Sequence, residues 1–203
     1  MSSQPETLLQ ILGQSLTSAT QRSGPHLACR PGCAQCCHGV FEISALDAQR
    51  LRDGLAEADA AASARILARV AQARARLAPF FPGDPSTGVL RGSEEETELF
   101  EEWAHADPCP ILDPESQTCD LYAHRPILCR TFGPPIRNDA ADPAAGLAIC
   151  ELCFTAATPE EIAAAEMDSS FRTLEQSLES GYAANHPFTG PTIVAFAFGT
   201  EAR

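Results

Sequence analysis

The chain contains no lysine: all fourteen of its basic residues are arginine, whereas its aspartates and glutamates number twenty-seven. The formal net charge is −13 at pH 7. Nucleic-acid binders need clustered positive charge, because much of their affinity comes from contacts with phosphates. The sequence therefore predicts no nucleic-acid partner, and we expect anionic membrane surfaces to repel the chain.

Long apolar runs are missing as well. The stretch 1–21 has neither a basic segment nor an unbroken apolar segment, so it predicts neither a secretory signal peptide nor a transmembrane helix. We therefore expect a cytoplasmic protein without a membrane partner, in a compartment that keeps thiols reduced. Aromatic residues make up only 6% of the chain, but a hydrophobic content of 44% is typical of a globular protein.

Cysteine, in contrast, is abundant. An odd number of thiols in a reducing compartment argues against a closed disulfide framework and favours metal binding. The nine cysteines form three groups, spaced C-x3-C-x2-C-C, then at intervals of ten residues, then C-x2-C: Cys29, Cys33, Cys36 and Cys37; Cys109, Cys119 and Cys129; Cys150 and Cys153.

A gap of two residues lets successive sulfurs converge on one centre, as in zinc ribbons and in iron–sulfur loops. Soft thiolates suit zinc or an iron–sulfur cluster such as [4Fe–4S], and they do not suit calcium or magnesium. We expect the neighbours Cys36 and Cys37 to point in different directions, so that one of them serves a second site, bridges two metals or stays a thiol. Eight of the nine cysteines would fill two four-sulfur sites. For an isolated residue such as Cys119, a place in the apolar core is the alternative.

Four thiolates around a divalent ion leave about two net negative charges. Arginines next to the cysteines are therefore candidates to neutralise the centre and to bind the cofactor. We assign this role to Arg125 and Arg130, with Arg30 as a weaker candidate. His38 and His124 are weak candidates for imidazole ligands.

The hydrophobic pattern predicts a mainly α, small single domain with long irregular loops that metal bonds tie together, and at most a few short strands. A helix is expected over 5–18, and a second follows the stripe Ile66, Leu67, Val70, Ala73 and Leu77. We divide the chain into an N-terminal helix (1–25), a cysteine-cluster metal-binding domain with inserted helices (26–157), and a C-terminal helix and tail (158–203).

Two capping-box patterns, Ser93 with Glu96 and Thr158 with Glu161, predict the starts of two further helices. In the first, we expect Leu99, Phe100 and Trp103 to pack on the core while the glutamates face water. The second pattern opens a last long helix with the stripe Met167, Phe171, Leu174 and Leu178, which we expect to end at Gly181. The tail 192–199 is expected to be a strand or a packed extended end.

The segments "CRPGCAQCC" and "CPILDPESQTCDLYAHRPILCRTFG" resemble the YkgJ-type cysteine-cluster family, which has a CxxCxxCC signature. The resemblance runs from Cys29 to Cys153, although three residues rather than two separate Cys29 from Cys33. It implies a chelated zinc, iron or iron–sulfur centre in a bacterial cytoplasmic protein, and no defined reaction. Flagellin lysine methylases carry a related cysteine cluster, so methyl transfer is an activity that this resemblance suggests by analogy.

The sequence leaves several functions open. The first is a metal- or cluster-binding protein whose centre is structural or serves sensing or electron transfer. The second is an iron–sulfur enzyme for methyl transfer or redox chemistry; radical-SAM chemistry is disfavoured by Gln35 and by the missing strand–helix alternation. The third is a zinc-stabilised interaction module whose acidic helix 94–102 meets a basic protein partner. No catalytic residue or protein partner is assigned.

Overall fold

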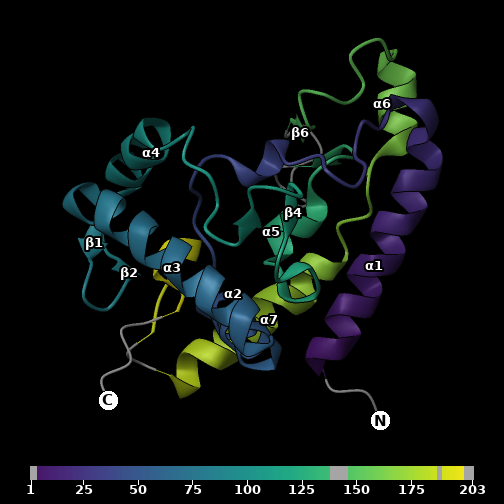
Figure 1. Ribbon diagram of the computed structural model, residues 1–203. Helices are drawn as coiled ribbons and strands as arrows, with labels where there is room; N and C mark the ends of the chain where they lie inside the picture. The colour runs from purple at the N-terminus through teal and green to yellow at the C-terminus, as the bar shows by residue number, and fades with distance from the viewer. Residues whose placement is uncertain (1–3, 138–145, 187–188, 199–203) are drawn as a thin grey trace. The chain divides into compact units, whose positions relative to one another are not determined.

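The computed structural model describes residues 4–137, 146–186 and 189–198 (Figure 1). The chain divides into two compact units, each assembled from two separate stretches: a first unit of Met1–Arg30 and Ile127–Gly181, and a second unit of Pro31–Pro126 and Tyr182–Arg203. In the described residues, strands form only three antiparallel pairs of two residues each, and helices supply most of the regular structure. The expected mainly α fold with a few short strands is thus confirmed.

The first unit is built on α1, whose residues Leu8, Leu12 and Ala19 lie on one buried face. This face packs against Met167 and Phe171. Helix α1 also lies beside α6, as their neighbouring ribbons show (Figure 1). No described helix, α1 included, is long and apolar enough to cross a membrane. The elements of this unit are α1 Gln4–Ser23, η1 Gly24–His26, α5 Ile127–Thr131, β5 Ile136–Arg137, β6 Leu147–Ala148, α6 Pro159–Ala165 and most of α7 Phe171–Asn185.

The single last helix expected from Thr158 onward is wrong, because the structure has two helices there. The capping box of Thr158 and Glu161 is present, but α6 ends at Ala165. The Arg22 guanidinium donates to the carbonyl oxygens of Ala164 at 2.8 Å and Glu166 at 2.7 Å, which satisfies backbone acceptors at this helix end. The prediction that Gly181 ends the helix is also wrong, because α7 continues to Asn185.

The second unit packs two capped helices, α2 and α3, around the C-terminal tail. The predicted stripe of Ile66, Val70, Ala73 and Leu77 is buried, whereas Leu67 is 45% exposed. The elements of this unit are η2 Gln35–Cys37, α2 Ala45–Glu57, α3 Ala60–Leu77, η3 Ala78–Phe80, β1 Gly83–Asp84, β2 Val89–Leu90, α4 Glu94–Trp103, β3 Leu112–Asp113, β4 Thr118–Cys119, η4 Tyr122–His124 and η5 Val194–Phe196.

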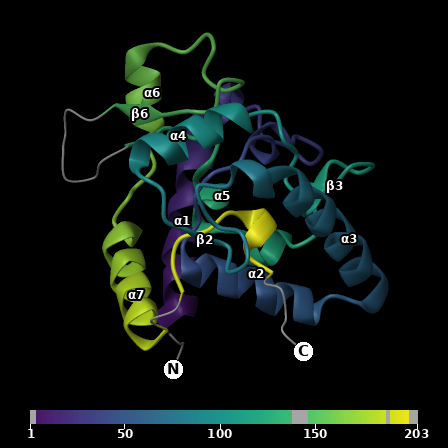
Figure 2. The same ribbon diagram turned by 90° about the vertical axis from the view of Figure 1, so that its left-hand side faces the viewer.

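The described part of the tail, residues 189–198, is neither a strand nor simply extended. It forms the 3-10 turn η5, the yellow helical turn of Figure 2. This turn contacts α3, and its residues Val194, Ala195 and Phe196 are buried. Ile193 is only 1% exposed and Phe196 only 3%, so the tail supplies core residues to the second unit. Gly199, the last residue of the predicted segment, lies outside the described residues.

Helix α4 begins at the predicted capping box, but only one of its three predicted core residues is buried. Phe100 is 4% exposed, whereas Leu99 is 59% and Trp103 47% exposed. The Trp103 ring instead packs on the Phe80 ring at the surface, with ring centroids 4.4 Å apart. Phe100 is therefore the one residue of this short helix that is buried in the core.

Replacing Phe100 by alanine should lower the free energy of unfolding by about 3–5 kcal/mol, because it opens a cavity in the core. The neighbouring change Leu99→Ala on the exposed face is the matched control and should cost no more than about 0.5 kcal/mol. Urea unfolding followed by circular dichroism measures both. Equal effects of the two changes would contradict the described orientation of α4.

Candidate metal centre

Cys36 and Cys37 lie in the 3-10 turn η2, in which the Cys37 N–H donates to the Ala34 carbonyl at 2.8 Å. The Cys37 thiol donates a hydrogen bond to the Cys36 sulfur. The expectation that these neighbours point in different directions is therefore wrong. A helical turn replaces the extended backbone that the expectation assumed, and it brings both sulfurs to one side.

A short antiparallel link joins this turn to a segment far along the chain. The Cys109 N–H donates to the Cys37 carbonyl at 2.8 Å, and the Gly39 N–H donates to the Asp107 carbonyl at 2.8 Å. His38 and Pro108 form the bridge pair between these two bonds. We call residues 37–39 and 107–109 the 37–109 link, and it places the second cysteine group beside the first.

The link needs glycine at position 39. Gly39 has a φ of +89°, which side-chain-bearing residues rarely adopt. A Cβ at this position would also lie 3.0 Å from the His105 carbonyl oxygen. The sequence reasoning missed Gly39, although a glycine directly after "CCH" is a signal for a special backbone conformation.

Cys119 is brought to Cys109 by the hairpin of β3 and β4, in which Cys119 pairs with Leu112. The Leu112 N–H donates to the Cys109 carbonyl at 3.0 Å, so the chain turns between Cys109 and the hairpin. Arg69 of α3 binds both ends of this hairpin segment: it donates a hydrogen bond to the Pro110 carbonyl at 2.9 Å, and it forms an ion pair with Asp120. Cys109 and Cys119 consequently pack against the same core cluster. We refer to Cys36, Cys37, Cys109 and Cys119 as the sulfur quartet.

The four sulfurs also act on one another electrostatically. The hydrogen bond from Cys37 and the charges of Arg125 and His38 lower the pKa of Cys36 to about 6. The same hydrogen bond, together with burial, raises the pKa of Cys37 far above its ordinary value. Burial, with the charge of Cys119 adding to it, raises the pKa of Cys109 to about 12. Burial likewise raises the pKa of Cys119, against the opposing charge of Arg125.

The positive charge of Arg125 lies near two cysteines of the quartet, Cys36 and Cys119. Its guanidinium lies 3.9 Å from the centroid of the Tyr122 ring, a cation–π contact that orients it. Its charge lowers the pKa values of both Cys36 and Cys119. His124, a weak ligand candidate, instead hydrogen bonds to Glu57 at 3.0 Å.

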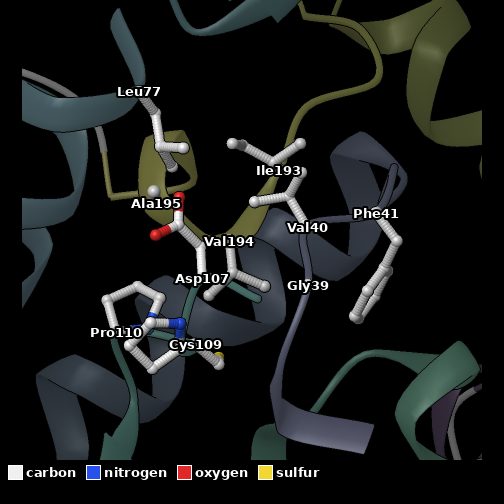
Figure 3. A pocket seen from close by; sticks show the side chains of 11 residues that line it. Gly39, Val40, Phe41, Leu77, Asp107, Cys109, Pro110, Ile193, Val194 and Ala195 are labelled. Atoms are coloured by element: carbon white, nitrogen blue, oxygen red, sulfur yellow. The ribbon is translucent and has the colours of Figure 1, made fainter. Parts of the chain in front are cut away.

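An apolar hollow lies beside Cys109 (Figure 3). Its walls include Val40, Leu77 and Val194, and the residues labelled in Figure 3 come from the link, from the residues directly after its two halves, from α3 and from the tail. The Asp107 carboxylate at this hollow accepts a hydrogen bond from Arg76 at 2.8 Å. Apolar walls next to a sulfur limit water access and strengthen electrostatic interactions there.

The remaining cysteines are distributed over both units. Cys33 belongs to the second unit and lies in the loop before η2. The first unit contains Cys29, Cys129, Cys150 and Cys153, with Cys129 and Arg130 on α5. All nine cysteines are described and none is disulfide bonded. In the described part of the chain, no three Cys, His, Asp or Glu side chains already have the arrangement of a metal site.

Residues 28–145 match the model of the CxxCxxCC family, described as a "putative zinc- or iron-chelating domain". The matched stretch is more than half of the 203 residues and includes all cysteines up to Cys129. The chain belongs to the CxxCxxCC family. Cys150 and Cys153 lie beyond the matched stretch. No curated protein and no solved structure matches the chain.

Replacing Gly39 by alanine should lower the free energy of unfolding by about 2–3 kcal/mol, because it adds both backbone strain and a clash with the His105 carbonyl. Gly32→Ala is the matched control: Gly32 has a φ of +86°, but a Cβ there would meet no atom within 4 Å. This control should cost about 1 kcal/mol, the strain alone. Urea unfolding compares the two variants, and equal losses would show that the 37–109 link does not require glycine.

In the reduced, metal-free protein, Cys36 should react with iodoacetamide at lower pH than an ordinary thiol. Its pKa of about 6 means that the thiolate forms as the pH rises past 6, whereas ordinary cysteines need a pH above about 8. Mass spectrometry of alkylated peptides over pH 5–9 gives the midpoint. Arg125→Gln should move this midpoint upward, because it removes a cation that favours the thiolate; an unchanged midpoint would place Arg125 away from Cys36.

Proposed function

We propose that this chain is a metal-binding protein whose sulfur quartet holds one zinc or iron ion as a structural tie of the second unit. The observation that carries the proposal is the 37–109 link, in which the Cys109 N–H donates to the Cys37 carbonyl at 2.8 Å. This bond joins the first two cysteine groups through the backbone. Membership of a family described as zinc- or iron-chelating supports the same chemistry.

The contact between the Cys36 and Cys37 thiols favours a single ion over a larger cluster. Ligand sulfurs of one tetrahedral ion, each about 2.3 Å from the metal, lie about 3.8 Å apart. That separation is close to the separation of two thiols in hydrogen-bond contact. Thiolates of a [4Fe–4S] cluster bind different irons and lie farther apart. Closing the full quartet on one ion requires side-chain rotations, since the described side chains do not yet form a site.

Arg125 fits the charge of such a centre. Four thiolates and a divalent ion carry about two negative charges, which a neighbouring guanidinium partly offsets. Tyr122 holds that guanidinium in place, with its charge directed to Cys36 and Cys119. We assign Arg125 as the residue that stabilises the loaded site. Arg130 lies in the first unit, so we give it no role at the quartet.

A site filled by four protein sulfurs has no open coordination position, so it stabilises the fold and does not activate a substrate. The loop 104–126 benefits most from such a tie. It contributes Ile111 and Leu121 to the core, but its regular structure is limited to one two-residue hairpin and one 3-10 turn among the described residues. Metal bonds would hold the rest of this loop to η2.

Anaerobic purification followed by elemental analysis and an absorption spectrum tests the proposal. Cys109→Ser and Cys119→Ser should each lose the metal of the second unit and lower the melting temperature, because a quartet with three sulfurs is a weaker chelator. Cys33→Ser is the matched control, since it removes a thiol of the same unit that stands outside the quartet. It should leave metal content and melting temperature unchanged.

Two outcomes would contradict this assignment. Inorganic sulfide with about four irons per site would show a [4Fe–4S] cluster and reopen the enzymatic hypotheses. Loss of metal in Cys33→Ser together with its retention in Cys37→Ser would show that the ligand set is wrong, although the protein still binds metal.

A further inference from the structure

The first unit holds a second set of cysteines that the family match leaves without an explanation. Cys150 and Cys153 lie beyond the matched residues 28–145, yet they share one unit with Cys29 and Cys129. Cys153 is buried in a small apolar cluster with Phe154 and Ala165, and the partly buried Cys150, Leu27 and Ala28 pack against this cluster. Two separate parts of the chain therefore meet at these thiols.

The C-x2-C segment has the tight turn of a chelating loop. The Cys153 N–H donates to the Cys150 carbonyl at 2.8 Å, which closes the turn between the two cysteines. Phe154, directly after it, has a φ of +57°, an unusual conformation for an aromatic residue. The Phe154 N–H donates to the His26 carbonyl at 2.9 Å, and the two rings stack with centroids 5.6 Å apart. The strained residue is thus held in place by the segment that leads to Cys29.

One of the two sulfurs, that of Cys153, accepts a hydrogen bond from a backbone N–H. The Ala28 N–H lies 3.3 Å from the Cys153 Sγ and donates to it. Such N–H to sulfur bonds stabilise the negative charge of a thiolate ligand and fix its orientation. Cys153 itself is 5% exposed, so its sulfur has little water to stabilise that charge. The next residue after Ala28 is Cys29, which the same bond brings to the C-x2-C turn.

The segment after α5 lies against the sulfur of Cys29, which is otherwise exposed. A Cβ on Gly133 would lie 2.9 Å from the Cys29 Sγ, and Gly133 has a φ of +117°. Only glycine satisfies both conditions without a shift of the chain. Cys129 is four residues earlier, on the short helix α5 that leads into this segment. Chain segments carrying Cys29, Cys150 and Cys153 therefore meet, and α5 with Cys129 leads into the segment that contacts Cys29.

We propose that the first unit contains its own thiolate metal site, with Cys29, Cys150 and Cys153 as ligands and Cys129 as the fourth. Its metal is a soft-ligand divalent ion, zinc or iron(II), because all four donors are sulfur. The site is independent of the sulfur quartet. The two sites together use eight of the nine cysteines and leave Cys33 as a thiol.

Titration of Co²⁺ into the reduced, metal-free full chain tests this proposal, because thiolate-bound Co²⁺ absorbs through sulfur-to-metal charge transfer. Wild-type protein should take up two equivalents. The double change Cys150→Ser with Cys153→Ser should lose one equivalent and about half of the charge-transfer intensity. Cys109→Ser with Cys119→Ser should lose the other equivalent, and Cys33→Ser should lose neither.

The variants separate this site from the proposed function. Uptake that is lost with Cys150 and Cys153 but unaffected by Cys109 and Cys119 supports this site and contradicts the quartet. Uptake that is lost with Cys109 and Cys119 but unaffected by Cys150 and Cys153 overturns this site and leaves the quartet intact. The site is also overturned if the Cys150 and Cys153 double variant still takes up two equivalents, as the wild type does.

Loss of folding could imitate loss of a ligand, so two further measurements accompany the titration. Cys153→His keeps a metal-binding side chain and should restore uptake, with the absorption of a three-sulfur site. Circular dichroism of each metal-free variant should match that of the metal-free wild type. A folded Cys153→His variant that binds no more Co²⁺ than the double-serine variant would count against Cys153 as a ligand.

Discussion

One backbone contact organises the second unit: the antiparallel link in which the Cys109 N–H bonds to the Cys37 carbonyl and the Gly39 N–H to the Asp107 carbonyl. Peptide groups that lose contact with water need partners, and here two half-buried segments provide them for each other. The same pairing fixes the distance between two cysteine groups that are far apart in sequence. The hairpin with Cys119 follows Cys109 in the chain, and the apolar hollow lies beside Cys109. The charge of Arg125 acts on Cys119 in this hairpin.

The division into units separates the first sequence motif. Cys29 belongs to the first unit, whereas Cys33, Cys36 and Cys37 belong to the second. A motif that is continuous in sequence is therefore divided between the two units. Each unit instead combines cysteines from distant stretches of chain, next to its own apolar clusters. This arrangement is physically reasonable, because sulfur–metal bonds add stability where irregular loops bury little apolar surface.

Local sequence patterns predicted the helices correctly where interactions between residues close in sequence determine a helix and its start. The stripe from Ile66 to Leu77 and the capping boxes at Ser93 and Thr158 are present as expected. The prediction failed where a residue distant in sequence stabilises the end of a helix. Arg22 satisfies carbonyls at the end of α6, and nothing near Ala165 in sequence announces this. The exposure of Leu99 likewise depends on how α4 meets the core, because periodicity identifies an apolar face but not how much of it is covered.

For the candidate site, the sequence by itself determined the chemistry. Nine cysteines at close spacings, without lysine and with arginines beside them, indicate soft-metal chelation, and the family match agrees. Only the tertiary structure decided which cysteine groups the backbone brings close together. A local hydrogen bond to Ala34 closes the turn of Cys36 and Cys37, but the link at Gly39 needs backbone hydrogen bonds to residues 107–109, far along the chain. Each unit likewise combines two stretches that are distant in sequence. Residue type sets which metal a side chain can bind, but the path of the backbone sets which side chains meet.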